Sequence, residues 1–239
     1  MKRWSPLLVL FICLLAPLQP VRAGQNLLSQ GIAAQKAGNN ELALALLGQY
    51  LQQNPGVAEA RRHLALALAG LGRNTEALAE LDRGLAEHPR DLQLLLAKAH
   101  LLASLERRPE AIKLLTAVLA CDPKNVEVLK ERGECLAQEG SLPEALADLN
   151  RAAQLAPKDP WVFNKRGMAW FCQGDYQKAV ADFSTAIRLA PDLPHAYFFR
   201  GNIYRYHLGE IDKAIADYRK ACALGHPLGC LELEKLGVR

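Results

Sequence analysis

The chain has 239 residues, 50% of them hydrophobic, with 29 lysines and arginines against 25 aspartates and glutamates, which gives a formal net charge of +4. A chain of this length and composition can bury a substantial core, and no low-complexity stretch interrupts it. Nucleic acid is excluded as a partner, because binding it requires a concentrated basic face that so balanced a chain does not provide.

The first 23 residues are typical of a secretory signal peptide. Two basic residues near the start precede an apolar run over 7–16, and the small-residue ending Val21-Arg22-Ala23 follows. The apolar run is too short for a membrane span, which needs about 20 residues, so an uncleaved anchor is the weaker interpretation. We therefore predict cleavage after Ala23, no membrane insertion afterwards, and a periplasmic protein over 24–239 whose net charge falls to +1.

A 34-residue period organises the rest of the chain. An alanine stands twelve residues before each of five periodic prolines, and a glycine or alanine stands twelve residues before that. Small residues at two fixed places let paired helices approach closely, and a proline ends each second helix because it cannot continue one. A fixed period of this size predicts a solenoid. The prolines are Pro55, Pro89, Pro123, Pro157 and Pro191.

Taken in chain order, the period predicts an all-α, right-handed solenoid of six helix pairs followed by a capping helix over 227–237. Four of the pairs have a glycine at the turn between their helices. The sixth copy is irregular, because one extra residue lies between Gly201 and Ala214 and the closing proline slips to Pro227. The predicted repeats are 24–57, 58–91, 92–125, 126–159, 160–193 and 194–227.

The segment WVFNKRGMAWFCQGDYQKAVADFSTAIRLAP carries the repeat pattern most fully. It has a small residue, an aromatic, a Gly-Asp-Tyr turn, an alanine, an aromatic and the closing proline in order. In these features the chain resembles the tetratricopeptide repeat family, and the resemblance covers essentially everything after the predicted signal peptide. It implies that the first helices of the pairs line a concave groove that binds a partner. The residues that carry it are Gly167, Trp170, Ala179, Phe183 and Pro191.

The end of the sixth copy, DYRKACALGHPLGC, resembles the Sel-like relatives of these repeats, whose cysteines recur at the spacing of Cys222 and Cys230. This resemblance implies a disulfide between the two cysteines that fastens the capping helix to the end of the stack. Export to an oxidising compartment permits such a bond. Metal binding by the two cysteines and His226 is the alternative, but Gly225 and Pro227 break the helix that would align the ligands.

No cluster of chemistry-bearing residues is evident elsewhere. The six histidines are scattered without a HExxH spacing, and no phosphate-cradling glycine motif occurs. The remaining cysteines, Cys121, Cys135 and Cys172, are expected to be buried or half-buried thiols, and whether they are free stays open. Since an enzyme needs a converging nucleophile, base and stabilising group, we predict no catalytic residue, no metal and no cofactor.

The family's groove positions map to side chains of the fifth and sixth repeats that suit an interface. Twelve of the thirteen aromatics after residue 23 lie between Trp161 and Tyr218, and aromatic rings and arginine dominate interface energetics. The resemblance implies that Asn202 hydrogen-bonds a peptide backbone. The alternative is that these rings merely contact the terminal helix. The predicted groove comprises Trp161, Asn164, Met168, Phe171, His195, Phe198, Asn202, Arg205 and Tyr206.

The family's carboxylate clamp is not predicted, although Lys130 stands at one clamp position. Glu134 replaces the expected asparagine, and His195 and Phe199 stand where lysine and arginine would be needed. We therefore predict a periplasmic scaffold that binds a peptide segment or helix of a partner protein in envelope assembly or secretion. The alternatives are a self-associating structural adaptor that forms homo-oligomers through its leucine-rich first repeats, and a regulatory subunit of an envelope enzyme.

Overall fold

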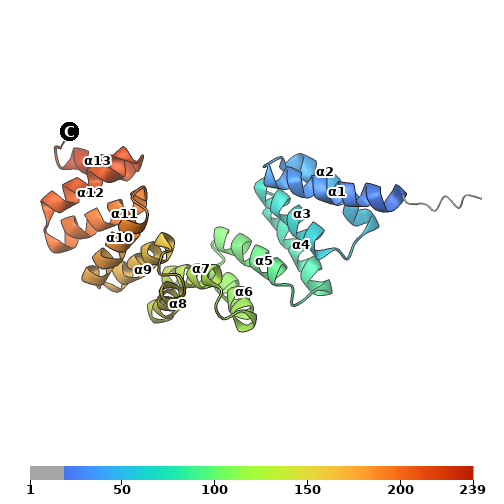
Figure 1. Ribbon diagram of the computed structural model, residues 1–239, viewed down its shortest axis with the longest axis horizontal. Helices are drawn as coiled ribbons and strands as arrows, with labels where there is room; N and C mark the ends of the chain where they lie inside the picture. Colours follow the sequence, from blue (N-terminus) through green and yellow to red (C-terminus); the bar gives the residue numbers. More distant parts are fainter. Residues whose placement is uncertain (1–18, 239) are drawn as a thin grey trace, which may run out of the picture. The chain divides into compact units, whose positions relative to one another are not determined.

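The computed structural model describes residues 19–238, and within that range every regular element is helical: thirteen α-helices and one π-helical turn (Figure 1). The helices pack in sequential pairs, and each first helix also contacts the second helix of a preceding pair within its unit. The chain divides into two compact units between Asp91 and Leu92.

Unit 1 contains two helix pairs, α1 (Gln19–Lys36) with α2 (Asn40–Gln53) and α3 (Ala58–Gly70) with α4 (Asn74–Glu87). Their crossings are set by small residues. A Cβ built on Gly31 would lie 2.7 Å from Cγ of Leu47, which is too close for any larger residue. The predicted small positions of this unit are therefore the points where the helices touch.

Unit 2 contains the remaining helices, and these confirm the all-α solenoid predicted from the period. Three regular pairs come first, then a pair interrupted by the π-helical turn, and then a single helix. The bounds are α5 (Leu92–Ser104), α6 (Arg108–Cys121), α7 (Val126–Gln138), α8 (Leu142–Leu155), α9 (Pro160–Gln173), α10 (Tyr176–Leu189), α11 (Pro194–Ile203), η1 (Tyr204–Leu208), α12 (Ile211–Ala223) and α13 (Pro227–Lys235).

Gly133, Gly167 and Gly201 lie at successive helix crossings of unit 2. A Cβ built at these positions would come within 2.8, 3.1 and 2.9 Å of a large side chain on the second helix of the same pair. Real Cβ atoms essentially never come within 3.0 Å of a neighbour, and a distance of 3.1 Å is tighter than nine in ten of their contacts, so each glycine permits a helix approach that alanine would hinder. The side chains they face are Leu149, Phe183 and Tyr218, all of which are fully buried.

The turns between paired helices use the left-handed backbone region. Gly38, Gly72, Gly140 and Gly174 have φ between 75° and 86°, the region that glycine enters without steric strain. Glu106 holds the corresponding place in the third repeat with φ 59°, and it is the one residue other than glycine with positive φ in the described chain. The backbone of the third turn is therefore strained.

The extra residue of the sixth repeat is accommodated as a π-helical turn. α11 runs into η1, where the helix widens before Gly209 reverses the chain with φ 69°. A π-helical turn absorbs a one-residue insertion without ending the helix. The repeat therefore keeps its packing on α12 despite the irregular spacing.

Three arginines of unit 2 repeat one polar arrangement. Each donates two hydrogen bonds of 2.7–2.8 Å to a buried aspartate on its own second helix, and a third to a side chain of the preceding second helix. Such two-pronged pairs are the strongest and most directional ion pairs. Each group connects three helices, in the fourth, fifth and sixth repeats. The groups are Arg132–Asp148–Thr116, Arg166–Asp182–Asn150 and Arg200–Asp217–Ser184.

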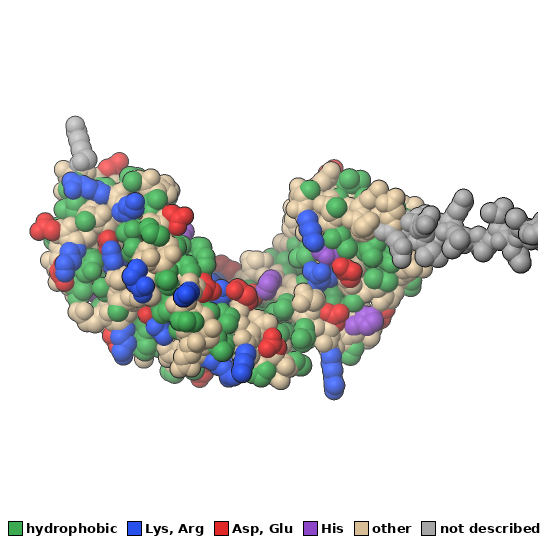
Figure 2. Space-filling view, viewed as in Figure 1, with side chains coloured by type: hydrophobic (Ala, Val, Ile, Leu, Met, Phe, Trp, Pro, Cys, Tyr) green, Lys and Arg blue, Asp and Glu red, His purple; other side chains and the backbone are tan. Residues whose placement is uncertain are grey.

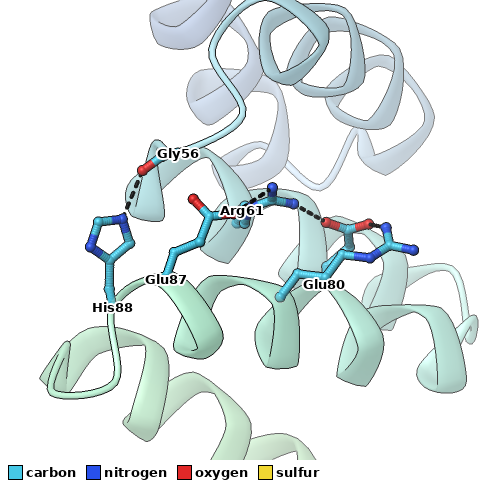
Figure 3. A network of polar contacts seen from close by, with 6 residues as sticks. Gly56, Arg61, Glu80, Glu87 and His88 are labelled. Atoms are coloured by element: carbon cyan, nitrogen blue, oxygen red, sulfur yellow. Dashed lines mark hydrogen bonds and ion pairs between the residues drawn. The ribbon is translucent and has the colours of Figure 1, made fainter.

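Unit 1 has a related network in a different register (Figure 3). Arg61 on α3 donates to Glu80 at 3.0 Å and to Glu87 at 3.1 Å, both on α4. At the end of α4, Nε2 of His88 lies 2.8 Å from the carbonyl oxygen of Gly56 in the loop before α3. Glu80 holds the repeat position that aspartate holds in unit 2, and its longer side chain reaches an arginine one turn earlier.

Most of the predicted signal peptide lies outside the described residues. α1 begins at Gln19 and so includes Val21 to Ala23, the predicted processing signal. Within residues 19–238, no helix has both the length and the apolar character required to cross a membrane.

Candidate functional site

A cavity of about 310 Å³ in unit 2 is lined by α7, α9 and α11, the first helices of three successive repeats. Four of the nine predicted groove residues line it: Trp161, Asn164, Met168 and His195. The sequence-based interpretation missed Lys165, Gln138 and Phe199, which also face the cavity. On the face of unit 2 that Figure 2 shows, basic side chains are interspersed with acidic and hydrophobic ones.

The wall of the cavity is mainly apolar, and core residues pack against its Phe199 ring. Trp161 is 48% exposed at the rim, and Met168 and Phe199 lie further along the groove. The Phe199 ring stacks on the fully buried Phe183 at 6.1 Å between centroids and meets Phe198 edge-on at 5.4 Å. An exposed indole beside fixed apolar side chains is the arrangement that anchors protein interfaces.

The charged groups at the cavity are already paired. Lys165 of α9 donates to Glu134 of α7, and Gln138 accepts a hydrogen bond of 2.6 Å from Arg108. The Lys165–Glu134 pair is therefore neutral as a whole, and the amide oxygen of Gln138 is already engaged.

Lys130, the residue at the family's clamp position, is also neutralised. Its buried ammonium group lies 2.7 Å from Asp159 and 2.8 Å from Glu127. Burial alone lowers the pKa of Lys130, but the hydrogen bonds to Asp159 and Glu127 outweigh burial and raise it. A partner carboxylate would therefore find this cation occupied.

Two histidines connect the cavity to the loop before α13. Nδ1 of His195 lies 3.1 Å from Nε2 of His226, and the His226 ring stacks on Phe198 at 4.4 Å between centroids. The other ring nitrogen of His226 is buried without a hydrogen-bond partner. Burial, helped by neighbouring His195, lowers the pKa of His226.

Asn164 is the cavity residue with an unsatisfied polar atom. Its side-chain oxygen is buried and has no hydrogen-bond partner among the described residues. A buried polar atom without a partner costs about 1–3 kcal/mol. Such an atom in a cavity wall is a candidate ligand contact.

Phe198 corrects one prediction for the groove. It is only 8% exposed and lies in a core cluster with Tyr218 and Leu233, whereas its neighbour Phe199 lines the cavity. On α11, His195 therefore lines the cavity as predicted, whereas the aromatic ring that lines it is Phe199 and not Phe198. The alternative that the rings contact the terminal helix holds for Phe198.

The other four predicted residues contact neighbouring elements. Tyr206 donates to Glu232 of α13 at 2.7 Å, and Arg205 donates to the same carboxylate. Asn202 accepts a hydrogen bond of 2.9 Å from Tyr218. Phe171 lies against Tyr176 and His207, with ring centroids 6.0 and 5.6 Å away. The cavity therefore does not bring these four together with Trp161, and their binding role stays a prediction.

The disulfide is confirmed: Cys222 at the end of α12 is bonded to Cys230 in α13. The other three cysteines of the described chain are free. Cys135 is buried, and burial raises the pKa of its thiol to about 11. Cys121 and Cys172 are exposed, so the expectation of buried thiols is wrong for these two.

Helix pairs at a 34-residue period, with a groove built from their first helices, define an α-helical repeat protein of the binding type. Family models for the tetratricopeptide repeat match residues 28–91, 96–160, 137–201 and 194–224. The chain belongs to the tetratricopeptide repeat family. These matches identify no catalytic domain.

Solved structures share the fold. PilF of Pseudomonas aeruginosa is 18% identical, with a TM-score of 0.75 over 90% of this chain and 98% of that one. MamA of strain AMB-1 is 23% identical, with a TM-score of 0.63 over 70% of this chain and 99% of that one. MamA of Desulfovibrio magneticus RS-1 is 20% identical, with a TM-score of 0.64 over 70% and 94%. No curated protein sequence matches the chain.

Proposed function

We propose that the protein is a non-catalytic scaffold that binds a segment of a partner protein in the cavity of unit 2. Tetratricopeptide repeats generally bind proteins, and solenoids of this kind use their concave faces to do so. The observation that carries the proposal is the cavity itself, formed by three successive first helices and rimmed by the exposed Trp161.

The ionisable groups at the cavity support binding over catalysis. Glu134 and Lys165 neutralise each other, and His195 is engaged with His226. A general base or nucleophile must be free to meet a substrate atom. The scaffold therefore acts by affinity and positioning.

We further propose that the protein is exported, processed after Ala23 and active in the periplasm, where its partner belongs to an envelope assembly or secretion system. The apolar run over 7–16 and the small-residue ending support export, and a disulfide suits an oxidising compartment. N-terminal sequencing of the exported protein should begin at Gly24. A product that still starts at Met1 contradicts processing.

The binding site is tested by truncating the cavity rim. In the double variant Trp161→Ala and Met168→Ala, a partner captured from envelope extract by the unaltered protein should be lost, because the apolar contact area is removed. Circular dichroism should show unchanged helical content. Leu155→Ala, which truncates a residue 40% exposed on α8, is the matched control and should retain the partner. Equal capture by the double variant would place the site elsewhere.

A further inference from the structure

The cavity of unit 2 carries enough chemistry to define the class of segment that it binds. We infer that it takes one uncharged, apolar side chain from an extended segment, and that the Asn164 carboxamide hydrogen-bonds a peptide group of that segment. This inference rests on the proposed binding function and names the ligand chemistry of the same site.

Charge complementarity indicates an uncharged occupant. Glu134 and Lys165 face the cavity as an ion pair, and Lys130 is held by Asp159 and Glu127. A charged side chain entering here would lose its hydration without meeting an unpaired opposite charge, which is unfavourable. A carboxylate-ended or lysine-bearing segment is therefore excluded from this position.

The lining indicates an apolar occupant of modest size. Trp161, Met168, Phe199 and Ala137 contribute apolar side chains to the lining. A volume of about 310 Å³ is at the lower end of the 300–1,000 Å³ that is typical of small-ligand cavities. The cavity therefore fits a side chain of a segment and not the whole width of a helix, which is about 10 Å.

The unsatisfied atom of Asn164 indicates a peptide group. Its side-chain oxygen has no partner, and rotation about the terminal torsion of asparagine is soft. Because the oxygen is buried in the unbound protein, binding requires this rotation to turn the oxygen or the NH2 group toward the cavity. A carboxamide has both an acceptor and donors, which match the N–H and C=O of a peptide group. In a helix those main-chain groups bond one another, so an extended segment is the partner that offers them.

The family resemblance implied this anchoring role for Asn202. That side chain already accepts a hydrogen bond of 2.9 Å from the buried Tyr218, and using it for a ligand would leave the tyrosine hydroxyl unsatisfied. The side-chain oxygen of Asn164 has no hydrogen-bond partner to lose. Substitution of Asn164 should therefore weaken peptide binding, whereas substitution of Asn202 should not, and the two variants can be compared directly.

The experiment uses the full chain and labelled 12-residue glycine-serine peptides that carry one central guest: leucine, phenylalanine, glutamate or lysine. Binding is measured by fluorescence anisotropy. Leucine and phenylalanine guests should bind at least tenfold more tightly than the charged guests. N-methylation of the peptide bonds around the guest, one at a time, should weaken binding about tenfold at one position, the loss expected for one hydrogen bond to a buried partner.

Variants identify the anchor. In Asn164→Leu the effect of N-methylation should disappear, whereas Asn202→Leu, with helical content checked, should retain it. Two results overturn the inference: tighter binding of charged guests, or an N-methylation effect that is unchanged in Asn164→Leu. If Trp161→Ala abolishes binding in the same experiment, the proposed site itself still stands. If no guest binds, or if Trp161→Ala has no effect, the proposed site fails together with the inference.

Discussion

Among the described residues, Glu106 is the one residue other than glycine in the left-handed backbone region. It holds φ 59° at a turn where the neighbouring repeats have glycine. Its side chain is 80% exposed, and its ion pair with Arg108 is a long contact of 3.8 Å. The side chain therefore contributes little that would offset the strain.

We predict that Glu106→Gly raises the free energy of unfolding of unit 2 by about 0.5–1 kcal/mol, because glycine relieves the left-handed strain. Urea titration followed by the fluorescence of Trp161 and Trp170 measures it. The reciprocal change Gly140→Glu, at the equivalent turn with φ 81°, should destabilise by a similar amount. Equal stability of both variants would contradict the strain argument.

The buried aspartates of unit 2 make a second prediction at the scale of single residues. Asp182 is 6% exposed and receives two hydrogen bonds of 2.7 Å from Arg166. Asp182→Ala should destabilise unit 2 by about 3–5 kcal/mol, because it leaves a partly buried guanidinium without its counter-charge. The exposed pair Arg107–Glu110 is the control, and Glu110→Ala should change stability by less than about 1 kcal/mol.

Replacing both Arg166 and Asp182 distinguishes the cost of an unpaired charge from the cost of lost packing. The double variant Arg166→Met and Asp182→Leu should recover most of the stability lost in Asp182→Ala, because an apolar pair of similar volume is often neutral. Thermal unfolding followed by circular dichroism measures the difference. If the double variant is as unstable as the single one, the loss comes from packing and not from an unpaired charge.

The sequence predicted the crossing glycines correctly but placed only part of the groove. Gly133, Gly167 and Gly201 follow the 34-residue period, so their crossings could be predicted from spacing alone. An arginine precedes each of these glycines and binds a buried aspartate on the second helix of the pair. These arginines and aspartates follow almost the same 34-residue period, so the sequence pattern could have identified the ion pairs, but the sequence analysis missed them. Phe198 could not be placed, since contacts with the terminal helix decide which face of α11 is buried.

At the scale of helices, α13 is held onto the solenoid by three separate attachments. The disulfide joins it to α12, and His226 closes its N-terminal side against α11. In addition, Glu232 of α13 accepts hydrogen bonds from Tyr206 and Arg205 of η1, and from Lys235 of α13 itself. Burial alone raises the pKa of Glu232, but these hydrogen bonds and the nearby charges lower it overall. The π-helical turn that carries Tyr206 thus has a structural use.

His226 makes the attachment of α13 sensitive to acid. Burial lowers the pKa of His226 below its usual value of about 6.5. The unfolded chain therefore takes up a proton before the folded chain does, so the stability from the neutral ring is complete above pH 6.5 and is lost as the pH falls. We predict that the unaltered protein loses more stability between about pH 7.5 and 5 than His226→Gln does, as measured by urea titration.

His100 provides a control of opposite sign. The hydrogen bond to Glu131 raises the pKa of His100. The stabilisation from the protonated ring is therefore complete below about pH 6.5 and is lost as the pH rises through the raised pKa. His100→Gln should make unit 2 relatively less stable in acid. If both histidine variants shift the pH profile in the same direction, the assignment of these pKa values is wrong.

At the scale of the whole molecule, repetition explains how much could be predicted. A period of 34 residues fixed the helix pairs, the turns and the family, because every copy repeats the same steric requirements. The structure differs from the sequence-based prediction mainly at the last repeat. The last repeat contains the extra residue before α12 and packs against the added helix α13, which follows no other repeat. Three predicted groove residues, Phe198, Arg205 and Tyr206, contact α13.

The account's central claim is that the cavity of unit 2 receives a partner segment. Photo-cross-linking in the living cell tests this directly, with p-benzoylphenylalanine placed at Met168 in the cavity and, as control, at Leu155 on α8. We predict that irradiation links a discrete partner protein to position 168 and not to position 155, with the cross-linked partner peptide carrying an apolar residue at the attachment site. Equal cross-linking from both positions, or a partner linked from position 155 alone, would contradict the claim.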